Sequence, residues 1–220
     1  MNILVSGGAG FIGARLVVRL AAAGHCVRIL DNLSPQIHGE VPRTLEWANW
    51  PGIELLRRTV TSAAAWDEAL EDMDVVIHLA AETGTGQSMY LISRYHEVNA
   101  HGTALLVEAL LRSKHKRVRR VILASSRAVY GEGAYVCEQC DIGRFSPEPR
   151  SALALAEHVW GHRCPTCGHD ATPAATRESD AMSPASIYAV TKLSQEQLIR
   201  VGCDSVQIDH VILRLQNVYG

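Results

Sequence analysis

The chain has 220 residues, of which 47% are hydrophobic and 20% are charged, and its formal net charge is -2. These values are typical of an ordinary globular protein and exclude a disordered chain, a collagen-like fibre and a disulfide-rich miniprotein. The nearly balanced charge provides no overall field that would favour nucleic acid or an anionic membrane, so neither is expected as a partner.

Strand-like and helix-like segments alternate along the first 130 residues. Helices are expected over Phe11–Ala23 and Ala63–Glu71, and the segment Tyr90–Ser113 is expected to be mostly helical. The expected strands are the short apolar runs Ile3–Ser6, Val27–Leu30, Ile53–Arg57, Val75–Ala80 and Val121–Ala124. Repeated units of this kind predict an α/β fold with a Rossmann-type, doubly wound parallel sheet.

The alternation breaks between residues 132 and 183 and resumes with an expected helix over Ile187–Val201 and an expected strand over His210–Leu215. The chain is therefore predicted to consist of a dinucleotide-binding core (1–131), an insertion (132–183) and the remainder of the core (184–220). The N-terminus has no basic leader, and no apolar run reaches the roughly 18 residues that a membrane-spanning helix needs, so a cytoplasmic protein is expected.

A glycine-rich turn joins the first expected strand to the first helix, with Gly7, Gly10 and Gly13 spaced as G-x-x-G-x-x-G. Glycines at such a turn allow a tight bend, close approach of the backbone to a pyrophosphate and close packing of helix on strand. The free N–H groups at the helix N-terminus complement the phosphate charge. The turn therefore predicts a dinucleotide cofactor.

Asp31 ends the second expected strand, 18 residues after Gly13. A carboxylate at this place can accept hydrogen bonds from the adenosine ribose hydroxyls, and it would repel a 2′-phosphate. The residue therefore favours NAD over NADP as the cofactor.

A tyrosine and a lysine, Tyr188 and Lys192, lie four residues apart on the last expected helix. Because residues at this spacing share a helix face, the ammonium can stabilise the phenolate and lower a phenol pKa that is ordinarily about 10. Ser125 and Ser126 follow the fifth expected strand, at the edge where open α/β sheets bind ligands. Together these residues predict a proton-transfer site.

Four of the six cysteines form two C-x-x-C pairs inside the insertion, Cys137 with Cys140 and Cys164 with Cys167. Four thiolates arranged in this way predict a zinc-ribbon-like loop that holds a structural, tetrahedral zinc ion. Unmetallated thiols and redox chemistry are the alternatives. Because four protein ligands close the coordination sphere, catalysis at the metal is not expected.

These motifs, in this order, resemble those of the extended short-chain dehydrogenases/reductases, in the nucleotide-sugar epimerase and dehydratase group. The matching elements are Gly7–Gly13, Asp31–Ser34, His78–Ala81, Asn99 with Gly102 and Thr103, Ser125–Gly131, Tyr188–Lys192 and Leu213–Gly220. Set against that group the chain is short, and a seventh strand and a C-terminal substrate domain are expected to be missing.

The resemblance assigns roles to particular residues. It implies that Tyr188 is the catalytic base and Ser126 its helper, both at the substrate, while Lys192 assists Tyr188 and holds the nicotinamide ribose. It implies that Asn217 contacts the diphosphate of a nucleotide sugar. The further cofactor-binding residues that it implies are Phe11, Ile12, Asn32, Ala80, Ala81 and Asn99.

Two departures from the family pattern matter. Arg58-Thr59-Val60 stands where the family often has Gly-Asp-Val, whose aspartate binds adenine. Arg127-Ala128 follows Ser126 where the family's dehydratases carry Asp-Glu. Because no acid stands there to eliminate a hydroxyl, the sequence favours epimerisation or reduction over dehydration.

The four-cysteine insertion and the segment Glu82–Ser88 resemble dTDP-L-rhamnose 4-epimerases and related deoxysugar enzymes. The expected function is therefore NAD-dependent epimerisation at carbon 4 of a nucleotide deoxysugar through a 4-keto intermediate. A 4-ketoreductase that consumes NAD(P)H and a catalytically silent NAD-binding fragment are the alternatives. A homodimer is expected through the helices at Tyr90–Ser113 and Ile187–Val201.

Overall fold

The computed structural model describes residues 1–39, 45, 47, 49–112 and 117–219. Six of its strands form one parallel sheet in the order β3-β2-β1-β4-β5-β9, which is the order of a doubly wound dinucleotide-binding sheet and confirms the predicted fold class. The strands are β1 (Asn2–Ser6), β2 (Cys26–Asp31), β3 (Ile53–Arg57), β4 (Val75–His78), β5 (Arg120–Ser126) and β9 (Asp209–Leu215).

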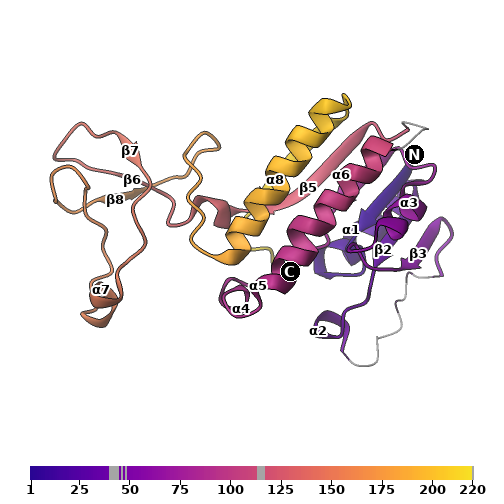
Figure 1. Ribbon diagram of the computed structural model, residues 1–220, viewed down its shortest axis with the longest axis horizontal. Coiled ribbons are helices and arrows are strands. Elements are labelled where there is room, and N and C mark those ends of the chain that lie inside the picture. Colours follow the sequence, from indigo (N-terminus) through magenta and orange to yellow (C-terminus); the bar gives the residue numbers. More distant parts are fainter. Residues whose placement is uncertain (40–44, 46, 48, 113–116, 220) are drawn as a thin grey trace.

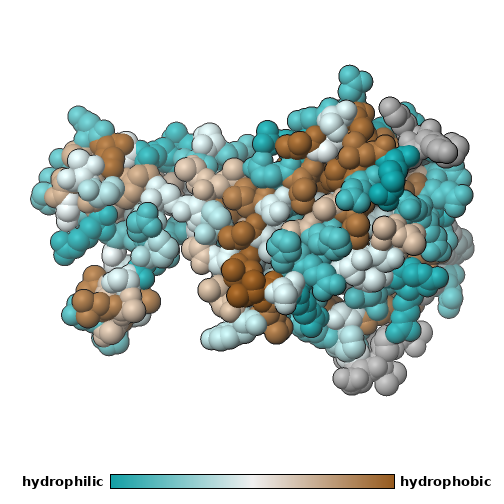
Figure 2. All heavy atoms as spheres, viewed as in Figure 1, coloured by the Kyte–Doolittle hydropathy of each residue, from teal (hydrophilic) through white to brown (hydrophobic). Residues whose placement is uncertain are grey.

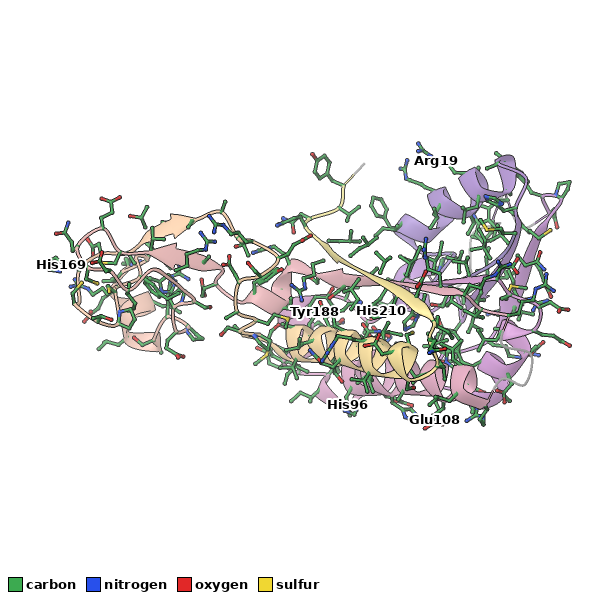
Figure 3. All side chains as sticks on the ribbon, turned by 90° about the horizontal axis from the view of Figure 1, so that it is seen from above. Arg19, His96, Glu108, His169, Tyr188 and His210 are labelled. Atoms are coloured by element: carbon green, nitrogen blue, oxygen red, sulfur yellow. The ribbon has the colours of Figure 1, made fainter. Side chains whose placement is uncertain are left out.

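Helices cover both faces of this sheet. On one face lie α3 (Ala63–Leu70), α6 (Gly102–Arg112) and α8 (Ile187–Ser205), and on the other lies α1 (Phe11–Ala22) (Figure 1 and Figure 3). Trp66, Leu106 and Ile199 fill the first interface with no exposed surface. Val17 of α1 is equally buried in the second. The short helix α2 (Pro35–His38) follows β2.

The segment Tyr90–Ser113, predicted to be mostly helical, is helical from Ile92 to Arg112, but it is not one regular α-helix. The chain forms α4 (Thr85–Ser88), α5 (Ile92–Tyr95) and a π-helical turn over His96–His101 that leads directly into α6. A π-turn carries one extra residue per turn, so it changes which side chains point inward without breaking the helical run. Here it accompanies a fully buried Asn99. Ser113 lies outside the described residues.

Two other boundaries differ from expectation. The strand predicted to run to Ala80 ends at His78, because the chain bends there to pack on the glycine turn, where a Cβ on Gly7 would lie 2.6 Å from the Ala80 nitrogen. The last helix continues past Val201 to Ser205, which gives it a longer buried face against α6.

The insertion has its own small antiparallel sheet in the order β7-β6-β8. Its elements are β6 (Ala134–Val136), β7 (Arg144–Phe145), α7 (Ala152–Ala156) and β8 (Thr172–Ala174). The insertion projects from the carboxyl end of β5, and His169 marks a point at its outer end, far from Tyr188 (Figure 1 and Figure 3).

No helix among the described residues has both the length and the apolar character that crossing a membrane requires.

Candidate functional site

A cavity of about 730 Å³ opens along the carboxyl ends of the parallel strands. It brings together twelve of the residues singled out from the sequence, namely Gly7, Gly10, Phe11, Ile12, Gly13, Asp31, Asn32, Ala80, Ala81, Ser126, Tyr188 and Asn217. Two others, Asn99 and Lys192, are buried behind the lining at 0% and 3% exposure. The cavity therefore joins the glycine turn to the predicted proton-transfer site.

The glycine turn is built so closely that side chains are excluded from it. Gly7 has φ +70°, a left-handed conformation that favours glycine. A Cβ on Gly13 would lie 2.5 Å from both the Gly7 carbonyl oxygen and the Gly8 Cα. Helix α1 begins after Gly10 without a side-chain cap, so its first N–H groups remain for an anionic ligand. This cradle fits the pyrophosphate of NAD.

Replacing Gly13 by Ala should push α1 away from β1, because the new methyl group meets backbone atoms that cannot rotate aside. We expect a loss of unfolding free energy of about 1–3 kcal/mol, as for other overpacked sites, and strongly weakened NAD binding. Thermal unfolding and calorimetric NAD titration measure the two effects. Gly86→Ala is the matched control, since nothing lies within 4 Å of a Cβ there; equal losses in both variants would contradict the prediction.

Asp31 is tied into the glycine turn. One carboxylate oxygen accepts a hydrogen bond from the Ala9 N–H at 3.0 Å, and the other accepts one from the Leu33 N–H at 2.9 Å. Each oxygen keeps a further lone pair, and the residue lines the cavity. A carboxylate held in this way can accept hydrogen bonds from ribose hydroxyls.

Tyr188 and Lys192 lie on the first turns of α8, with the Lys192 Nζ 6.0 Å from the centre of the tyrosine ring. The pKa of Tyr188 is raised overall by burial, although a hydrogen bond with Ser126 acts to lower it. Burial lowers the pKa of Lys192 to about 8, while the Glu196 carboxylate acts to raise it. The Lys192 ammonium donates to the Ala124 carbonyl at 2.9 Å, which anchors α8 on β5.

The start of α8 is held by Ser88, the last residue of the matching segment Glu82–Ser88, to which the sequence assigned no role. The buried Ser88 Oγ accepts a hydrogen bond from the Tyr188 N–H at 3.0 Å and donates to the Thr85 carbonyl at 2.6 Å. Tyr95 packs edge-on against the Tyr188 ring, with the ring centres 6.4 Å apart. Helices α4 and α5, which follow β4, thus hold the Tyr188 backbone and the Tyr188 ring.

A buried polar network lies behind the cavity. Asn99 accepts a hydrogen bond from the Glu82 N–H at 2.8 Å and donates to the Thr191 hydroxyl at 3.0 Å. His78 bonds to the Ser6 hydroxyl at 2.6 Å and to the Thr103 hydroxyl at 2.9 Å. Burial lowers the pKa of His78 to about 3, with a further lowering by Lys192, so its imidazole is neutral. The network joins β1, β4, α6 and α8 beneath the site.

The four cysteines of the insertion converge. Their sulfur atoms all lie within 4.8 Å of one another, with 3.5 Å separating Cys137 from Cys167 and Cys140 from Cys164. Four sulfurs around a tetrahedral zinc ion, each at about 2.3 Å, lie about 3.8 Å apart. The donor set therefore fits zinc.

Several residues of the cavity lining were not selected from the sequence as site residues. Arg58 and Thr59 follow β3, Thr83 follows β4, and Arg127 follows β5, so all four lie at carboxyl ends of strands. That position is the signal that could have identified them, because ligands of open α/β sheets bind along this edge.

Comparison with known proteins places these features in a wider group. Residues 3–166 match the model of the NAD dependent epimerase/dehydratase family. The chain is 42% identical over 222 residues to a dTDP-L-rhamnose 4-epimerase of Burkholderia thailandensis, covering 100% of this chain and 58% of that protein. It is 31% identical over 164 residues to a UDP-glucose 4-epimerase of Bacillus subtilis, covering 71% of this chain and 46% of that protein.

Solved structures that are similar to this chain include two further 4-epimerases. The crystal structure of UDP-glucuronic acid 4-epimerase from Bacillus cereus in complex with UDP-glucuronic acid and NAD is similar with a TM-score of 0.72 and 28% identity, covering 100% of this chain and 58% of that one. A UDP-N-acetylglucosamine 4-epimerase from Methanobrevibacter ruminantium has a TM-score of 0.71 and 27% identity, with 100% and 56% covered. The chain thus spans about half to three-fifths of the length of these relatives.

Proposed function

Because the chain belongs to the NAD-dependent epimerase/dehydratase family, we propose that it epimerises carbon 4 of a nucleotide-linked deoxysugar, with dTDP as the nucleotide. One observation carries the proposal: Ser126 and Tyr188 line the same cavity as the glycine turn that fits NAD. The 42% identity to a dTDP-L-rhamnose 4-epimerase over the whole chain supports this substrate class.

The proposed roles follow from the chemistry of each side chain. When bound, NAD supplies a hydride acceptor for carbon 4 of the sugar and then a hydride donor to the opposite face of the 4-keto sugar. Tyr188, as its phenolate, takes the proton of the 4-hydroxyl and returns it to the oxygen, while Ser126 polarises that oxygen. Lys192 favours the phenolate by its charge. Asn217, at the mouth of the cavity, binds the diphosphate.

The cofactor contacts belong to the same proposal. Gly7, Gly10 and Gly13 bind the pyrophosphate, with Phe11 and Ile12 contributing N–H groups from the first turn of α1. Asp31 and Asn32 bind the adenosine ribose, which favours NAD over NADP. Ala80 and Ala81 line the cofactor, whereas Asn99 and Lys192 act from behind the cavity wall.

The test is to supply the purified chain and NAD with dTDP-L-rhamnose, and in separate arms with UDP-glucose and UDP-glucuronic acid, and to follow the sugar by NMR. We expect the 4-epimer of dTDP-L-rhamnose to form without net consumption of NADH. Stoichiometric consumption of NADH with a 4-keto sugar would instead identify a 4-ketoreductase. NAD binding with no conversion of any sugar would identify a catalytically silent module.

We also propose that residues 132–183 form a separate unit in which Cys137, Cys140, Cys164 and Cys167 hold one structural zinc ion. The convergence of the four sulfurs supports this proposal, as does the separate three-stranded sheet of the insertion. Cys137 directly follows β6, and Cys164 and Cys167 lie between α7 and β8. One metal ion would therefore link the segment after β6 to the segment before β8.

A homodimer is proposed through α5, the π-turn and α6, which occupy the segment Tyr90–Ser113, together with α8, which begins at Ile187. Hydrophobic side chains gather there (Figure 2), and the four consecutive residues Met89, Tyr90, Leu91 and Ile92 are 52%, 88%, 38% and 52% exposed. Exposed apolar clusters of this kind mark interaction surfaces. Light scattering across a range of protein concentrations measures the oligomeric state.

A further inference from the structure

A buried ion pair lies directly behind the predicted catalytic residues. Glu196, 3% exposed, stands one turn after Lys192 on α8 and therefore shares its face. Its carboxylate accepts a hydrogen bond from the Ser125 hydroxyl at 2.5 Å, next to Ser126 in the chain. The same carboxylate accepts from the Nε and Nη2 of Arg214 on β9, with the shortest distance 2.8 Å.

The other side of Arg214 faces the insertion. Its Nη1 donates to the Tyr130 hydroxyl at 2.5 Å and to the Glu178 carbonyl at 3.2 Å. Its Nη2 contacts the Met182 sulfur at 3.1 Å, and the guanidinium lies 4.9 Å from the centre of the Tyr130 ring. All three nitrogens of the Arg214 guanidinium therefore have partners. These contacts join α8 to the segment that leads back from the insertion.

This return segment, residues 178–183, is bound to the insertion at Asp180 and to the core at Ser183. The Asp180 carboxylate receives two hydrogen bonds from Arg144 of β7, at 2.9 and 2.6 Å, inside the insertion. At the other end, the Ser183 N–H donates to the Val129 carbonyl of the core at 2.9 Å. The Ser183 carbonyl also lies so close to Gly131 that a Cβ there would overlap its oxygen. The segment is therefore seated against the turn after β5.

We propose that Arg214 is a positioning residue that holds the Glu196 carboxylate against Ser125, on the helix face that Glu196 shares with Lys192, and that the return segment of the cysteine-containing insertion completes the contacts that hold Arg214. The inference rests on the proposed function, because it concerns the same Ser126–Tyr188–Lys192 site. It gives the insertion a role beside the site, because the Arg214 guanidinium joins the return segment of the insertion to Glu196 on α8.

The physical reason is that a buried carboxylate needs fixed donors to stay charged in place. The titratable groups that face Lys192 in the described residues are Tyr188 and Glu196 from α8 and His78 from β4. Burial lowers the pKa of Lys192 and Glu196 raises it, so a Glu196 that loses its charge or its position leaves the ammonium to deprotonate at lower pH.

The test uses the small number of lysines in the chain, which are Lys114, Lys116 and Lys192. With carbon-13 in the lysine side chains and NAD present, NMR follows each ammonium through its titration, and the signal that disappears in Lys192→Met is Lys192. Glu196→Gln should lower the Lys192 midpoint by about 1 pH unit, because it removes a negative charge one helical turn away that favours the ammonium. Glu108→Gln, which breaks an exposed ion pair on α6, is the control and should leave it unchanged.

A separate variant tests whether the insertion influences the Lys192 midpoint. Arg144→Gln leaves Glu196 and Arg214 intact but releases Asp180, so it should shift the Lys192 midpoint in the same direction by a smaller amount. Arg112→Gln, an exposed arginine paired with Asp67 and Glu108, is its control. Arg214→Lys keeps the positive charge but loses the several N–H donors of the guanidinium. In that background Arg144→Gln should no longer shift the Lys192 midpoint, because contacts that act through one group are not additive.

The outcomes separate the positioning role from the proposed activity. An unmoved Lys192 midpoint in Glu196→Gln, or an Arg144→Gln shift that persists without the Arg214 guanidinium, would overturn the inference. Should Glu196→Gln fail to fold, the Arg144 variant still decides, because its side chain lies in the insertion. The titration needs no sugar, so a chain that converts none contradicts the proposed function and leaves this measurement valid.

Discussion

Replacing Tyr188 by Phe should lower the turnover of the nucleotide sugar by at least about 10²–10⁴-fold, the contribution typical of general acid–base catalysis, while NAD binding is retained. The substitution removes one oxygen atom. The ring keeps its edge-on packing against Tyr95 at 6.4 Å, and the glycine turn that fits NAD is untouched. The loss therefore falls on proton transfer, and kcat should drop while the dissociation constant of NAD stays the same.

The measurement combines NMR assay of sugar conversion with calorimetric NAD titration on the same preparation. Tyr219→Phe is the matched control, because it makes the same chemical change on a side chain that is 91% exposed and does not line the cavity. Sustained conversion in Tyr188→Phe would show that another group takes the proton. A parallel loss of NAD binding would show that the phenol oxygen supports the cofactor site instead.

Local patterns made the cavity largely predictable from sequence. The glycine turn, Asp31 and the Tyr188–Lys192 pair each depend on short spacings within a strand–turn–helix unit or one helix, so the residues that must cooperate are neighbours in the chain. The parallel sheet then brings the carboxyl ends of its strands to one edge, which places Ser126 beside them. The two cysteine pairs were predictable for the same reason, because the two cysteines of each C-x-x-C pair are three residues apart in the chain.

The π-turn at His96–His101 was not predicted, because it lies inside a continuous helical run and no proline or glycine within it marks the extra residue. Its inward residue, Asn99, is held by backbone groups of Glu82, a contact across 17 positions. Glu196 illustrates the same limit. Its four-residue spacing from Lys192 is visible, but its partners Ser125 and Arg214 come from two other elements. Only the folded sheet shows that the three meet.

The cysteine cluster should lose its metal when one ligand is removed. Elemental analysis of the purified chain is expected to give about one zinc per molecule, and Cys164→Ser should abolish it, because four thiolates form the coordination sphere. Cys26→Ser is the control, since Cys26 is exposed and belongs to β2. Structural zinc in small zinc-binding peptides contributes about 10–16 kcal/mol of apparent binding free energy at pH 7, so its loss should unfold the insertion.

The core sheet should survive that loss, because its six strands and their covering helices pack without the insertion. Limited proteolysis is therefore expected to cut Cys164→Ser within residues 132–183 first, while NAD binding persists, and a chelator should reproduce this pattern in the unaltered chain. Zinc retained in Cys164→Ser, or a zinc-free insertion that resists protease, would mean that the four thiols hold no structural metal. Unfolding of the insertion should also release the return segment from Arg214, so the Lys192 midpoint should fall in the zinc-free chain as it does in Arg144→Gln.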